Sequence, residues 1–499
     1  MTFKEDLELI TRYQKEIVLI GKAAGLMHWD QETNMPKKGV EARAENVAFL
    51  AGLAHEKRTS EEFFEAAKRL QKNRELKEDD KIMLKRLLKD LEKSRTLSKE
   101  FVEELKRTST KARAAWMEAR EKKDFKIFRP HLEKIIELKR KEASYYKFPG
   151  HIYNGLLDDY EEGMTVEELK PKFAELKECL VALLNKIESS EKYKKQKHIL
   201  TKKDFPKELQ MELVKDVVKR MGLEDNFSRI DFSEHPFTID IGLNDIRITT
   251  NIRSDPLFSF GSSIHEAGHA LYMLGLPEEH FYNALGDSPS HGVHESQSRF
   301  WENMIGKSKN FWRFYFPKFS KKFDLGDNWK EWYDEINFVT PGKIRIEGDE
   351  VHYCLHIILR FEIELGLLDG SIKVSDLPEV WNNKMKELFG VIPENDKEGV
   401  LQDSHWSGGS FGYFPTYALG TIYATQLYKA ILKENPKLEE EIQQGDFSKI
   451  GKWLHKKIHR HGKRYIAEEL IKKTCGKGLN IKDYIDYLNK KYSEIYNLS

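Results

Sequence analysis

Residues 263–270 read SIHEAGHA, which places His265 and His269 four positions apart, with Glu266 directly after the first histidine. On an α-helix, side chains at positions i and i+4 lie on one face, so the two imidazoles can bind a single metal ion. Glu266 then lies close enough to exchange a proton with a water molecule on that ion. This combination predicts a zinc-type hydrolytic centre of the metallopeptidase kind.

The residues around this motif predict that it lies on a helix. Ser262 and Ser263 are residue types that cap helix starts, and residues 270–274 continue the apolar side of the helix. The alternative interpretation is a structural helix in which both histidines are hydrogen-bonded core residues and the glutamate forms an ion pair. A third ligand would favour the metal centre, because a catalytic zinc site needs three protein ligands and one open position.

The third ligand is predicted to be Glu295. The two turns after His269 contain no further histidine, whereas Glu295 lies near the start of another helical segment, at a spacing typical of glutamate-type zinc peptidases. The alternative for Glu295 is a solvent-exposed helix glutamate. His291 and His294 are rival ligands from the same segment, and Glu302, two turns beyond Glu295, is placed to orient a ligand histidine from behind.

The composition argues against several classes of protein. The 499 residues include 83 Lys and Arg against 82 Asp and Glu, a formal net charge of +1, so we expect neither nucleic-acid nor membrane binding. Charged residues make up 33% of the chain, a density that fits a protein from a hot environment. The hydrophobic fraction of 39% is sufficient for a large core.

Cysteine usage and the lack of long apolar runs predict a soluble, cytoplasmic enzyme. Cys179, Cys354 and Cys475 are widely separated and show neither metal-binding nor redox spacing, as expected of a reducing compartment. Residues 1–6 are charged where a signal peptide would be apolar, and no apolar run approaches the roughly 20 residues of a membrane span.

Hydrophobic periodicity predicts a mainly helical chain. Apolar residues recur at three- and four-residue spacing, with Lys and Glu between them, in many segments. The predicted helices cover residues 3–28, 76–95, 97–122, 125–147, 166–189, 206–221, 258–275, 291–320, 349–368, 415–434 and 480–495. The Lys-rich residues 192–207 are predicted to form an exposed loop. No clear boundary divides the chain, so we expect one domain over residues 1–499 with a substrate groove.

A small sheet is predicted just before the metal-binding helix. Its strands alternate polar and apolar residues over residues 230–232, 237–241 and 245–252. We expect an antiparallel sheet over residues 230–252, a helical part before it (1–229) and the metal-binding and C-terminal helical part after it (253–499). In zinc peptidases, an edge strand beside the metal helix commonly holds an extended peptide by backbone hydrogen bonds.

Several further motifs resemble those of the carboxypeptidase Taq family, the thermostable metallocarboxypeptidases. They occur in the family's order at residues 28–30 (HWD), 33–36 (TNMP), 235–237 (HPF), 245–249 (DIRIT), 294–297 (HESQ), 344–349 (IRIEGD) and 399–406 (GVLQDSHW). A set of ordered motifs is far more specific than one pentapeptide. One position departs from the pattern: Gly348 stands where the family usually has alanine, which should slightly loosen a helix start.

The resemblance implies a mainly helical fold with a deep, narrow groove, similar to those of neurolysin and angiotensin-converting enzyme. It implies the release of single C-terminal residues from peptides with broad specificity. It also implies one zinc or cobalt ion per chain and, usually, a homodimer. Carried over motif by motif, it implies His265, His269 and Glu295 as metal ligands and Glu266 as the catalytic carboxylate.

The tetrahedral oxyanion of peptide hydrolysis needs a hydrogen-bond donor, usually a tyrosine or a histidine in this type of site. Tyr413 and Tyr417 are both candidates for that donor, and His405 is a candidate contact to the substrate or the oxyanion. The alternative is that the two tyrosines are core aromatic residues that pack the start of a helix at Pro415.

An enzyme that acts at the C-terminus must recognise a free carboxylate, and arginine does so best because its guanidinium binds with two parallel hydrogen bonds. Arg345 and Arg247 are the candidates, since each lies in a motif shared with the family. The alternative for both is a structural ion pair with a nearby aspartate. His235 and Gln402, also from shared motifs, complete the predicted substrate-binding set.

Two other functions remain open at this point. A neurolysin-like oligopeptidase that cleaves internal bonds would share the metal site but would not need an arginine for a terminal carboxylate. A non-catalytic helical binding protein could merely retain a metal site, but the intact His265, Glu266, His269 and Glu295 argue against it.

Overall fold

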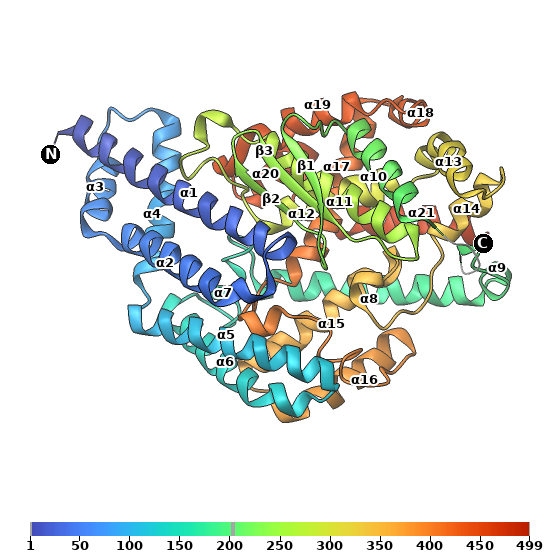
Figure 1. The fold of residues 1–499 in the computed structure, drawn as a ribbon, viewed down its shortest axis with the longest axis horizontal. Helices are drawn as coiled ribbons and strands as arrows, with labels where there is room; N and C mark the ends of the chain where they lie inside the picture. Colours follow the sequence, from blue (N-terminus) through green and yellow to red (C-terminus); the bar gives the residue numbers. More distant parts are fainter. Residues whose placement is uncertain (1, 201–204, 499) are drawn as a thin grey trace.

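The computed structural model describes residues 2–200 and 205–498, and its fold is mainly helical (Figure 1). The first four helices, coloured blue, lie at one end of the molecule: α1 (Phe3–Thr33), α2 (Val40–Thr59), α3 (Glu61–Gln71) and α4 (Glu78–Arg95). Of these, α1, α3 and α4 contribute a separate hydrophobic core that includes Ile10, Phe63 and Leu84. Leu285, which is distant in sequence, is also part of this core.

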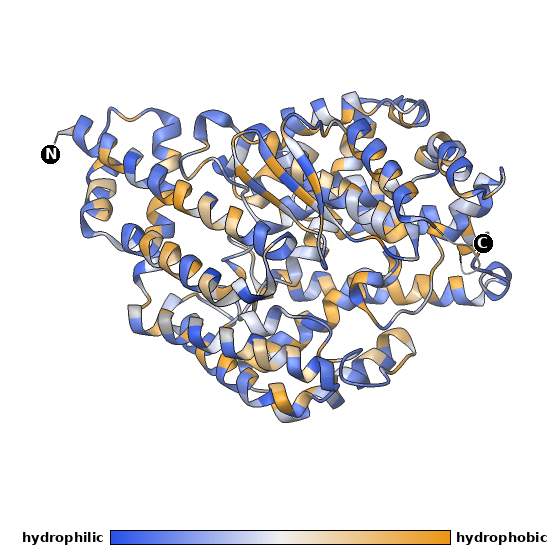
Figure 2. Cartoon of the chain, viewed as in Figure 1, coloured by the Kyte–Doolittle hydropathy of each residue, from blue (hydrophilic) through white to orange (hydrophobic). Residues whose placement is uncertain are grey.

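The next part of the chain contains four longer helices and two short ones, and three of the longer helices have polar caps at their N-termini. It comprises α5 (Lys99–Lys122), α6 (Phe125–Tyr146), α7 (Asn154–Leu157), α8 (Val166–Ser189), α9 (Glu191–Lys194) and α10 (Lys207–Met221). Ser98, Asp124 and Thr165 accept hydrogen bonds from the first turns of α5, α6 and α8, as expected of capping residues. Figure 2 shows hydrophilic and hydrophobic residues along each long helix, as a helix with one buried side requires.

The sheet lies directly before the metal-binding helix but is mixed rather than antiparallel. It contains β1 (Ser228–Phe232), β2 (Thr238–Gly242) and β3 (Asp245–Thr250) in the order β1-β3-β2. β2 and β3 are antiparallel as predicted, but β1 pairs parallel to β3, so the predicted fully antiparallel sheet is wrong. β3 has the most deeply buried residues, including Ile246 and Ile248, which explains why it takes the central position.

The metal-binding helix α11 (Pro256–Leu274) begins earlier than predicted. Asp255 is its N-cap and accepts a hydrogen bond from the Leu257 N–H, and Pro256 occupies the first turn. The prediction that Ser262 and Ser263 cap the helix is therefore wrong, because both lie inside it. Ser263 instead donates a hydrogen bond to a threonine of β3, so it helps to fix the sheet against α11.

The remaining helices form the larger part of the main hydrophobic core. They are α12 (His291–Arg299), α13 (Lys309–Phe323), α14 (Trp329–Ile336), α15 (Glu350–Asp369), α16 (Leu377–Phe389), α17 (Pro415–Glu434), α18 (Leu438–Gln443), α19 (Ser448–Lys457), α20 (Ala467–Cys475) and α21 (Ile481–Tyr496). The predicted single helix over residues 291–320 is wrong. α12 passes into a π-helical segment, η4 (Phe300–Gly306), and Ser308 caps a separate helix.

The predicted loop over residues 192–207 begins in the short helix α9, and residues 201–204 lie outside the described part of the chain. Gly348 precedes α15, where an added Cβ atom would lie 3.1 Å from the Arg345 carbonyl oxygen and 3.4 Å from the His356 ring.

Over residues 2–200 and 205–498, no helix has the length and apolar composition that crossing a bilayer would require.

Candidate metal centre

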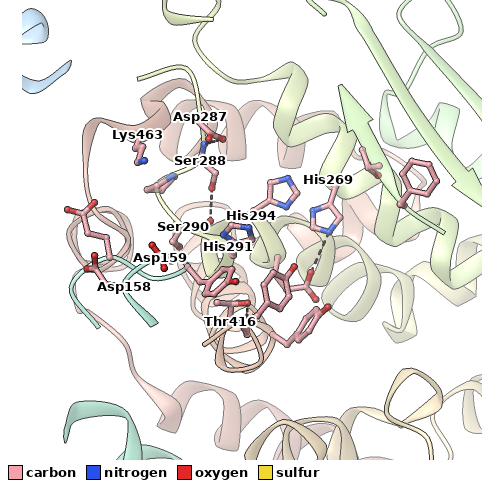
Figure 3. Close-up of a pocket in the computed structure, with 18 of the residues that line it drawn as sticks. Asp158, Asp159, His269, Asp287, Ser288, Ser290, His291, His294, Thr416 and Lys463 are labelled. Carbon is pink, nitrogen blue, oxygen red and sulfur yellow. Dashed lines mark hydrogen bonds and ion pairs between the residues drawn. The ribbon is translucent and has the colours of Figure 1, made fainter. Parts of the chain in front are cut away.

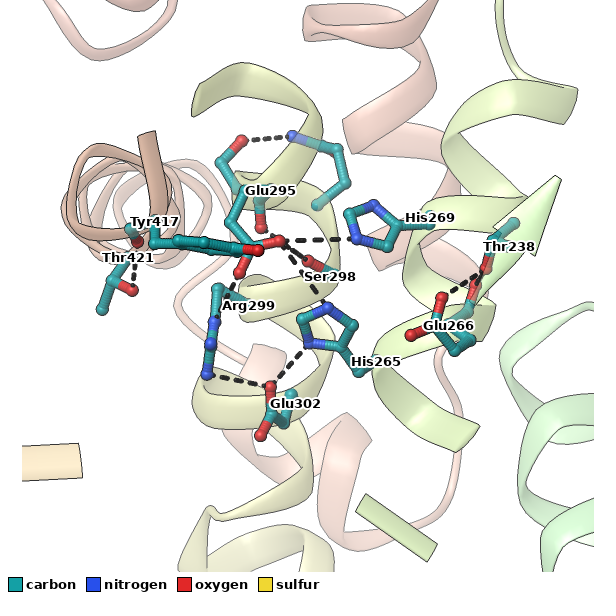
Figure 4. A network of polar contacts seen from close by, with 12 residues as sticks. Thr238, His265, Glu266, His269, Glu295, Ser298, Arg299, Glu302, Tyr417 and Thr421 are labelled. Carbon is teal, nitrogen blue, oxygen red and sulfur yellow. Dashed lines mark hydrogen bonds and ion pairs between the residues drawn. The ribbon is translucent and has the colours of Figure 1, made fainter. Parts of the chain in front are cut away.

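The structure brings His265, His269 and Glu295 together (Figure 4). The histidines lie on α11 and Glu295 lies on α12, which packs beside it. Glu295 Oε2 is 3.6 Å from His265 Nε2 and 3.4 Å from His269 Nε2. One ligand atom from each residue lies within 4.8 Å of the others, and no second cluster of three His, Cys, Asp or Glu ligands occurs among the described residues.

The close approach of α11 and α12 depends on Gly268. A Cβ atom at this position would lie 2.8 Å from the Gln297 carbonyl oxygen and 2.8 Å from Ser298 Cα, and backbone atoms cannot move aside easily. On the other side of α12, α17 approaches through Gly420, where a Cβ atom would lie 2.6 Å from Glu295 Cβ. Glycine on each neighbouring helix therefore fixes where the third ligand lies.

Arg299 and Glu302 surround the cluster with fixed charges. Glu302 Oε2 lies 2.8 Å from His265 Nδ1, so Glu302 orients a histidine from behind, as predicted. Arg299 Nε donates to Glu295 Oε1 at 2.8 Å, and its Nη1 donates to Glu302 Oε2 at 3.2 Å. The side chains of Glu295, Arg299, Glu302 and His265 thus form a closed ring of polar contacts.

Burial and these charges have opposite effects on the pKa values. Burial disfavours ionised Glu295 and Glu302, but His265 and Arg299 hold the pKa of Glu295 well below its ordinary value and lower the pKa of Glu302 to about 2. Burial likewise disfavours a charged His265, yet Glu295 and Glu302 raise its pKa to about 9. The site therefore stabilises positive charge between the imidazoles and Glu295, so these residues fit a divalent cation.

The rival ligands His291 and His294 lie close by but outside the cluster. The His294 ring stacks on His269 with ring centroids 4.2 Å apart. Burial, and then the charge of His269, hold the pKa of His294 well below its ordinary value. His291 meets the Tyr413 ring edge-on, with centroids 5.3 Å apart. Both histidines line the cavity beside the metal cluster, which is described below. Neutral imidazoles at this position can contact a bound molecule.

Glu266 lies beside the ligands and is held by the sheet. Its side chain is only 7% exposed, and Thr238, the first residue of β2, donates a hydrogen bond of 2.7 Å to its Oε2 (Figure 4). Glu266, Thr238 and all three predicted ligands line one cavity of about 670 Å³. In Figure 3, Asp158 and Lys463 lie at the end of this cavity that is farthest from His269. This cavity corresponds to the predicted groove, and its volume is typical of ligand sites.

Two of the three predicted oxyanion residues line the cavity. Tyr413 lies just before α17 and Tyr417 lies in its first turn, with ring centroids 5.2 Å apart. His405 lies behind them, outside the cavity lining, and its Nε2 is 3.3 Å from the Tyr417 hydroxyl. Burial, followed by the charge of Glu295, raises the pKa of Tyr413 well above its ordinary value. Tyr413 therefore keeps its proton at neutral pH and can donate it in a hydrogen bond.

The predicted substrate-binding residues lie outside the cavity lining. Arg345 donates from Nε and Nη2 to Asp403 Oδ1 at 3.0 and 2.9 Å, and the Gln402 side chain accepts the Arg345 backbone N–H. Arg247 donates to Asp245 and stacks on the Trp29 ring at 4.3 Å. His235 is exposed, but its neighbours 236–238 line the cavity.

Two residues that contact the centre, Arg299 and Thr238, were not predicted from the sequence. Arg299 follows Glu295 by four positions and precedes Glu302 by three, so helical spacing carried a signal for its ion pairs. Thr238 carried no such signal, because its contact with Glu266 depends on how the sheet packs against α11.

A buried cluster of two imidazoles and one carboxylate, with a further carboxylate beside it and a peptide-sized cavity, is the site of a metallopeptidase. Residues 9–492 match the carboxypeptidase Taq (M32) metallopeptidase family, and the chain belongs to this family. It is 38% identical to carboxypeptidase 1 of Bacillus subtilis over 97% of each chain. It is 36% identical to thermostable carboxypeptidase 1 of Thermus thermophilus, over 99% of this chain and 100% of the relative.

Solved structures show the same fold. A Pyrococcus furiosus carboxypeptidase is 36% identical over 98% of this chain and 99% of its own, with a TM-score of 0.94. Metallocarboxypeptidase 1 of Trypanosoma cruzi is 34% identical over 98% of this chain and 100% of its own, also with a TM-score of 0.94. The resemblance, the mainly helical fold and the predicted metallocarboxypeptidase function are confirmed. The family requires a divalent metal ion and acts on peptides, and the oligopeptidase alternative receives no support.

Proposed function

We propose that this metallocarboxypeptidase releases one C-terminal amino acid at a time, with broad specificity, and that His265, His269 and Glu295 hold its metal ion. The observation that carries this assignment is the convergence of the three ligand atoms beside Glu266, on the wall of one cavity. Zinc is the proposed ion because two imidazole nitrogens and one carboxylate oxygen suit it, and cobalt is the second candidate.

Glu266 is proposed as the general base. When bound, the divalent ion would supply Lewis acidity that acidifies a water molecule and polarises the scissile carbonyl. Glu266 takes a proton from the attacking water and passes it to the departing amine. The buried position of this carboxylate and its hydrogen bond to Thr238 support the assignment, because both restrict its orientation.

Tyr413 is proposed as the donor to the developing oxyanion, with Tyr417 and His405 behind it. The Tyr413 and Tyr417 rings lie with centroids 5.2 Å apart, and His405 Nε2 lies within hydrogen-bond distance of the Tyr417 hydroxyl. This chain of contacts leaves the proton of Tyr413 available to the cavity. The raised pKa of Tyr413, caused by burial and then by Glu295, keeps that proton in place.

Recognition of the terminal carboxylate stays a prediction for Arg345 and Arg247, with Gln402 and His235 as neighbouring contacts. Each arginine already pairs with an aspartate, Asp403 or Asp245, so a direct role requires the guanidinium to share its donors with the substrate. Arg345 is favoured, because its guanidinium lies 4.8 Å from the centre of the Tyr417 ring.

The test of the reaction compares one peptide with its C-terminally amidated form. Mass spectrometry should show a ladder of products that are shortened one residue at a time from the free C-terminus. The amidated peptide should remain intact, because it lacks the charge that an arginine binds. Equal shortening of both peptides would contradict exopeptidase action at a free carboxylate.

The cellular setting and assembly are also proposals. We propose that residues 1–499 act as a single catalytic domain, as a homodimer in the cytoplasm, without nucleic-acid or membrane partners. The balanced charge of +1 and the three separated cysteines support this setting. Light scattering coupled to gel filtration would test the dimer, because one chain has a mass of 58.5 kDa.

A further inference from the structure

We propose that Thr238 is a positioning residue for proton transfer, because its hydroxyl holds one oxygen of Glu266 and leaves the other to act as the base. This inference rests on the proposed role of Glu266 and adds a second residue to it.

The hydroxyl of Thr238 has two acceptors, and both belong to Glu266. Thr238 Oγ1 lies 2.7 Å from Glu266 Oε2 and 2.9 Å from the Glu266 main-chain oxygen (Figure 4). A hydroxyl donates only one proton, so it can serve one acceptor at a time. While Glu266 is ionised, the charged carboxylate is the stronger acceptor. Oε2 is then engaged, and Oε1 remains to receive a proton.

The second acceptor becomes useful once Glu266 is protonated. After the proton of the attacking water moves to Oε1, the carboxyl group is neutral and attracts the hydroxyl proton less strongly. That proton can turn to the main-chain oxygen of Glu266 without any movement of Thr238 Oγ1. When Oε1 passes its proton to the amine of the leaving residue, the carboxylate charge returns and the hydroxyl turns back. Thr238 itself neither gains nor loses a proton.

The strand position of Thr238 determines where its backbone groups point. The Thr249 N–H donates to the Phe237 carbonyl at 2.9 Å and the Phe237 N–H donates to the Thr249 hydroxyl at 2.9 Å, so Phe237 and Thr249 face each other just before the antiparallel ladder begins at Thr238. The next pair, Thr238 and Ile248, is then a non-hydrogen-bonded pair. The backbone N–H and C=O of Thr238 therefore point away from β3, along the outer edge of β2, where an extended peptide could bind them.

One residue thus contacts the base with its side chain and offers its backbone to the substrate. This separation predicts that loss of the hydroxyl affects the chemical step and leaves substrate binding in place. Thr238→Val removes the hydroxyl but keeps the branched shape and the backbone. Thr238→Ser restores a hydroxyl at the same position.

The experiment measures kcat, KM and metal affinity for both variants. We expect Thr238→Val to lower kcat about 10- to 100-fold, as for loss of one hydrogen bond to a charged group, with KM within about twofold of the unmodified enzyme. Thr238→Ser should recover most of kcat. Metal affinity, measured by competition with a chelator, should remain unchanged in both variants, since the Thr238 hydroxyl bonds to Glu266, which is not one of the three proposed ligands.

Thr425→Val is the matched control. Thr425 is a buried residue of α17, and its hydroxyl donates to the Thr421 carbonyl oxygen of the same helix at 3.1 Å, so its loss does not affect the contact between the sheet and α11. This variant should keep kcat close to that of the unmodified enzyme. An equal loss of kcat in Thr425→Val, or no loss in Thr238→Val, would overturn the proposal. Failure of Thr238→Ser to recover activity would overturn it as well.

A double variant separates this inference from the proposed function. In a Glu266→Gln background, adding Thr238→Val should cause no further loss of the residual rate, because both changes act on one proton transfer. A further loss of the same size would show that Thr238 acts independently of Glu266. Full activity of Glu266→Gln alone would instead contradict the role of Glu266 itself.

Discussion

Among single residues, Arg299 decides how Glu295 can bind a metal ion. It holds Glu295 Oε1 by an ion pair of 2.8 Å, so only Oε2 faces the two histidines. Its positive charge also offsets the buried charges of Glu295 and Glu302. A centre with two buried carboxylates and no arginine would neutralise the metal ion more strongly and would acidify water less.

Glu266→Gln should abolish turnover while the metal ion stays bound. Glutamine cannot accept a proton, and loss of a general base typically costs about 100- to 10,000-fold in rate. Elemental analysis should still give one ion per chain, because the proposed ligands are His265, His269 and Glu295. Glu278→Gln, an exposed change just after α11, is the control and should keep full activity. Hydrolysis at the usual rate by Glu266→Gln would refute its role.

Tyr413→Phe and Tyr417→Phe should lower kcat by different amounts. Loss of the Tyr413 hydroxyl removes the donor to the oxyanion, so kcat should fall about 100-fold or more with little change in KM. Tyr417→Phe should cause a smaller loss, because the Tyr417 hydroxyl already lies 3.3 Å from His405 Nε2. Steady-state kinetics on one peptide would separate them, and the reverse order of effects would assign the oxyanion contact to Tyr417.

For single residues, the sequence was sufficient to predict those whose positions depend only on spacing along one helix. His265, His269 and Glu266 follow from one helical turn, and Glu302 from its distance to Glu295. Contacts that depend on how separate elements pack could not be derived. The ion pair that occupies Arg345 and the hydrogen bond from Thr238 are both of this kind.

At the scale of elements, Gly268 controls the separation of α11 and α12. Gly268→Ala should push the two helices apart, because its Cβ atom would meet backbone atoms of α12 at 2.8 Å. We expect the free energy of unfolding to fall by about 2 kcal/mol or more. The metal should bind about tenfold more weakly or worse, because Glu295 moves away from the histidines. Denaturant titration and chelator competition measure the two effects.

Gly261→Ala on the same helix is the matched control for that change. A Cβ atom at Gly261 would meet no atom within 4 Å, so this substitution should only improve helix propensity. The expected gain in stability is about 0.5–1 kcal/mol, with metal affinity unchanged. If both alanine variants behaved alike, the separation of α11 and α12 would not depend on Gly268.

Element type was easier to predict than element order. Apolar spacing gave the long helices α5, α6, α8 and α17 nearly to their ends, because each buries one continuous side. Alternation identified three strands but not the parallel pairing of β1 with β3, which depends on the chain passing from β1 to the far edge of the sheet. The π-helical turn of η4 leaves the apolar pattern intact, so the break after α12 carried no clear signal.

For the whole molecule, two buried carboxyl groups link stability to pH. Glu364 of α15 accepts hydrogen bonds from Tyr153 at 2.6 Å and Trp406 at 2.9 Å, and Glu161 accepts one from Tyr423 at 3.0 Å. Each therefore joins segments that are far apart in the sequence. Burial raises the pKa of both carboxyl groups to about 7, although their hydrogen bonds lower it.

These raised pKa values predict the sign of a pH effect. The ordinary glutamate pKa is 4.5, so the folded protein holds both protons more tightly than the unfolded chain does. Their stabilising contribution is complete below about pH 4.5 and is lost as pH rises through about 7, by up to about 3 kcal/mol per group. The double variant with Glu161→Gln and Glu364→Gln should therefore lose less stability between pH 5 and 8 in urea titrations. An unchanged slope would contradict this assignment.

The separate core that α1, α3 and α4 form has a consequence for the far wall of the cavity. Leu285 is buried in that core, and the Ala284 N–H donates to the Gln14 side chain of α1 at 3.0 Å. The chain then continues directly into Asp287 and Ser288, which line the cavity. In a shortened protein that starts after α4, this loop would therefore lose the contacts that hold it. The side of the cavity that Asp287 and Ser288 form would then no longer have a defined geometry for binding a peptide.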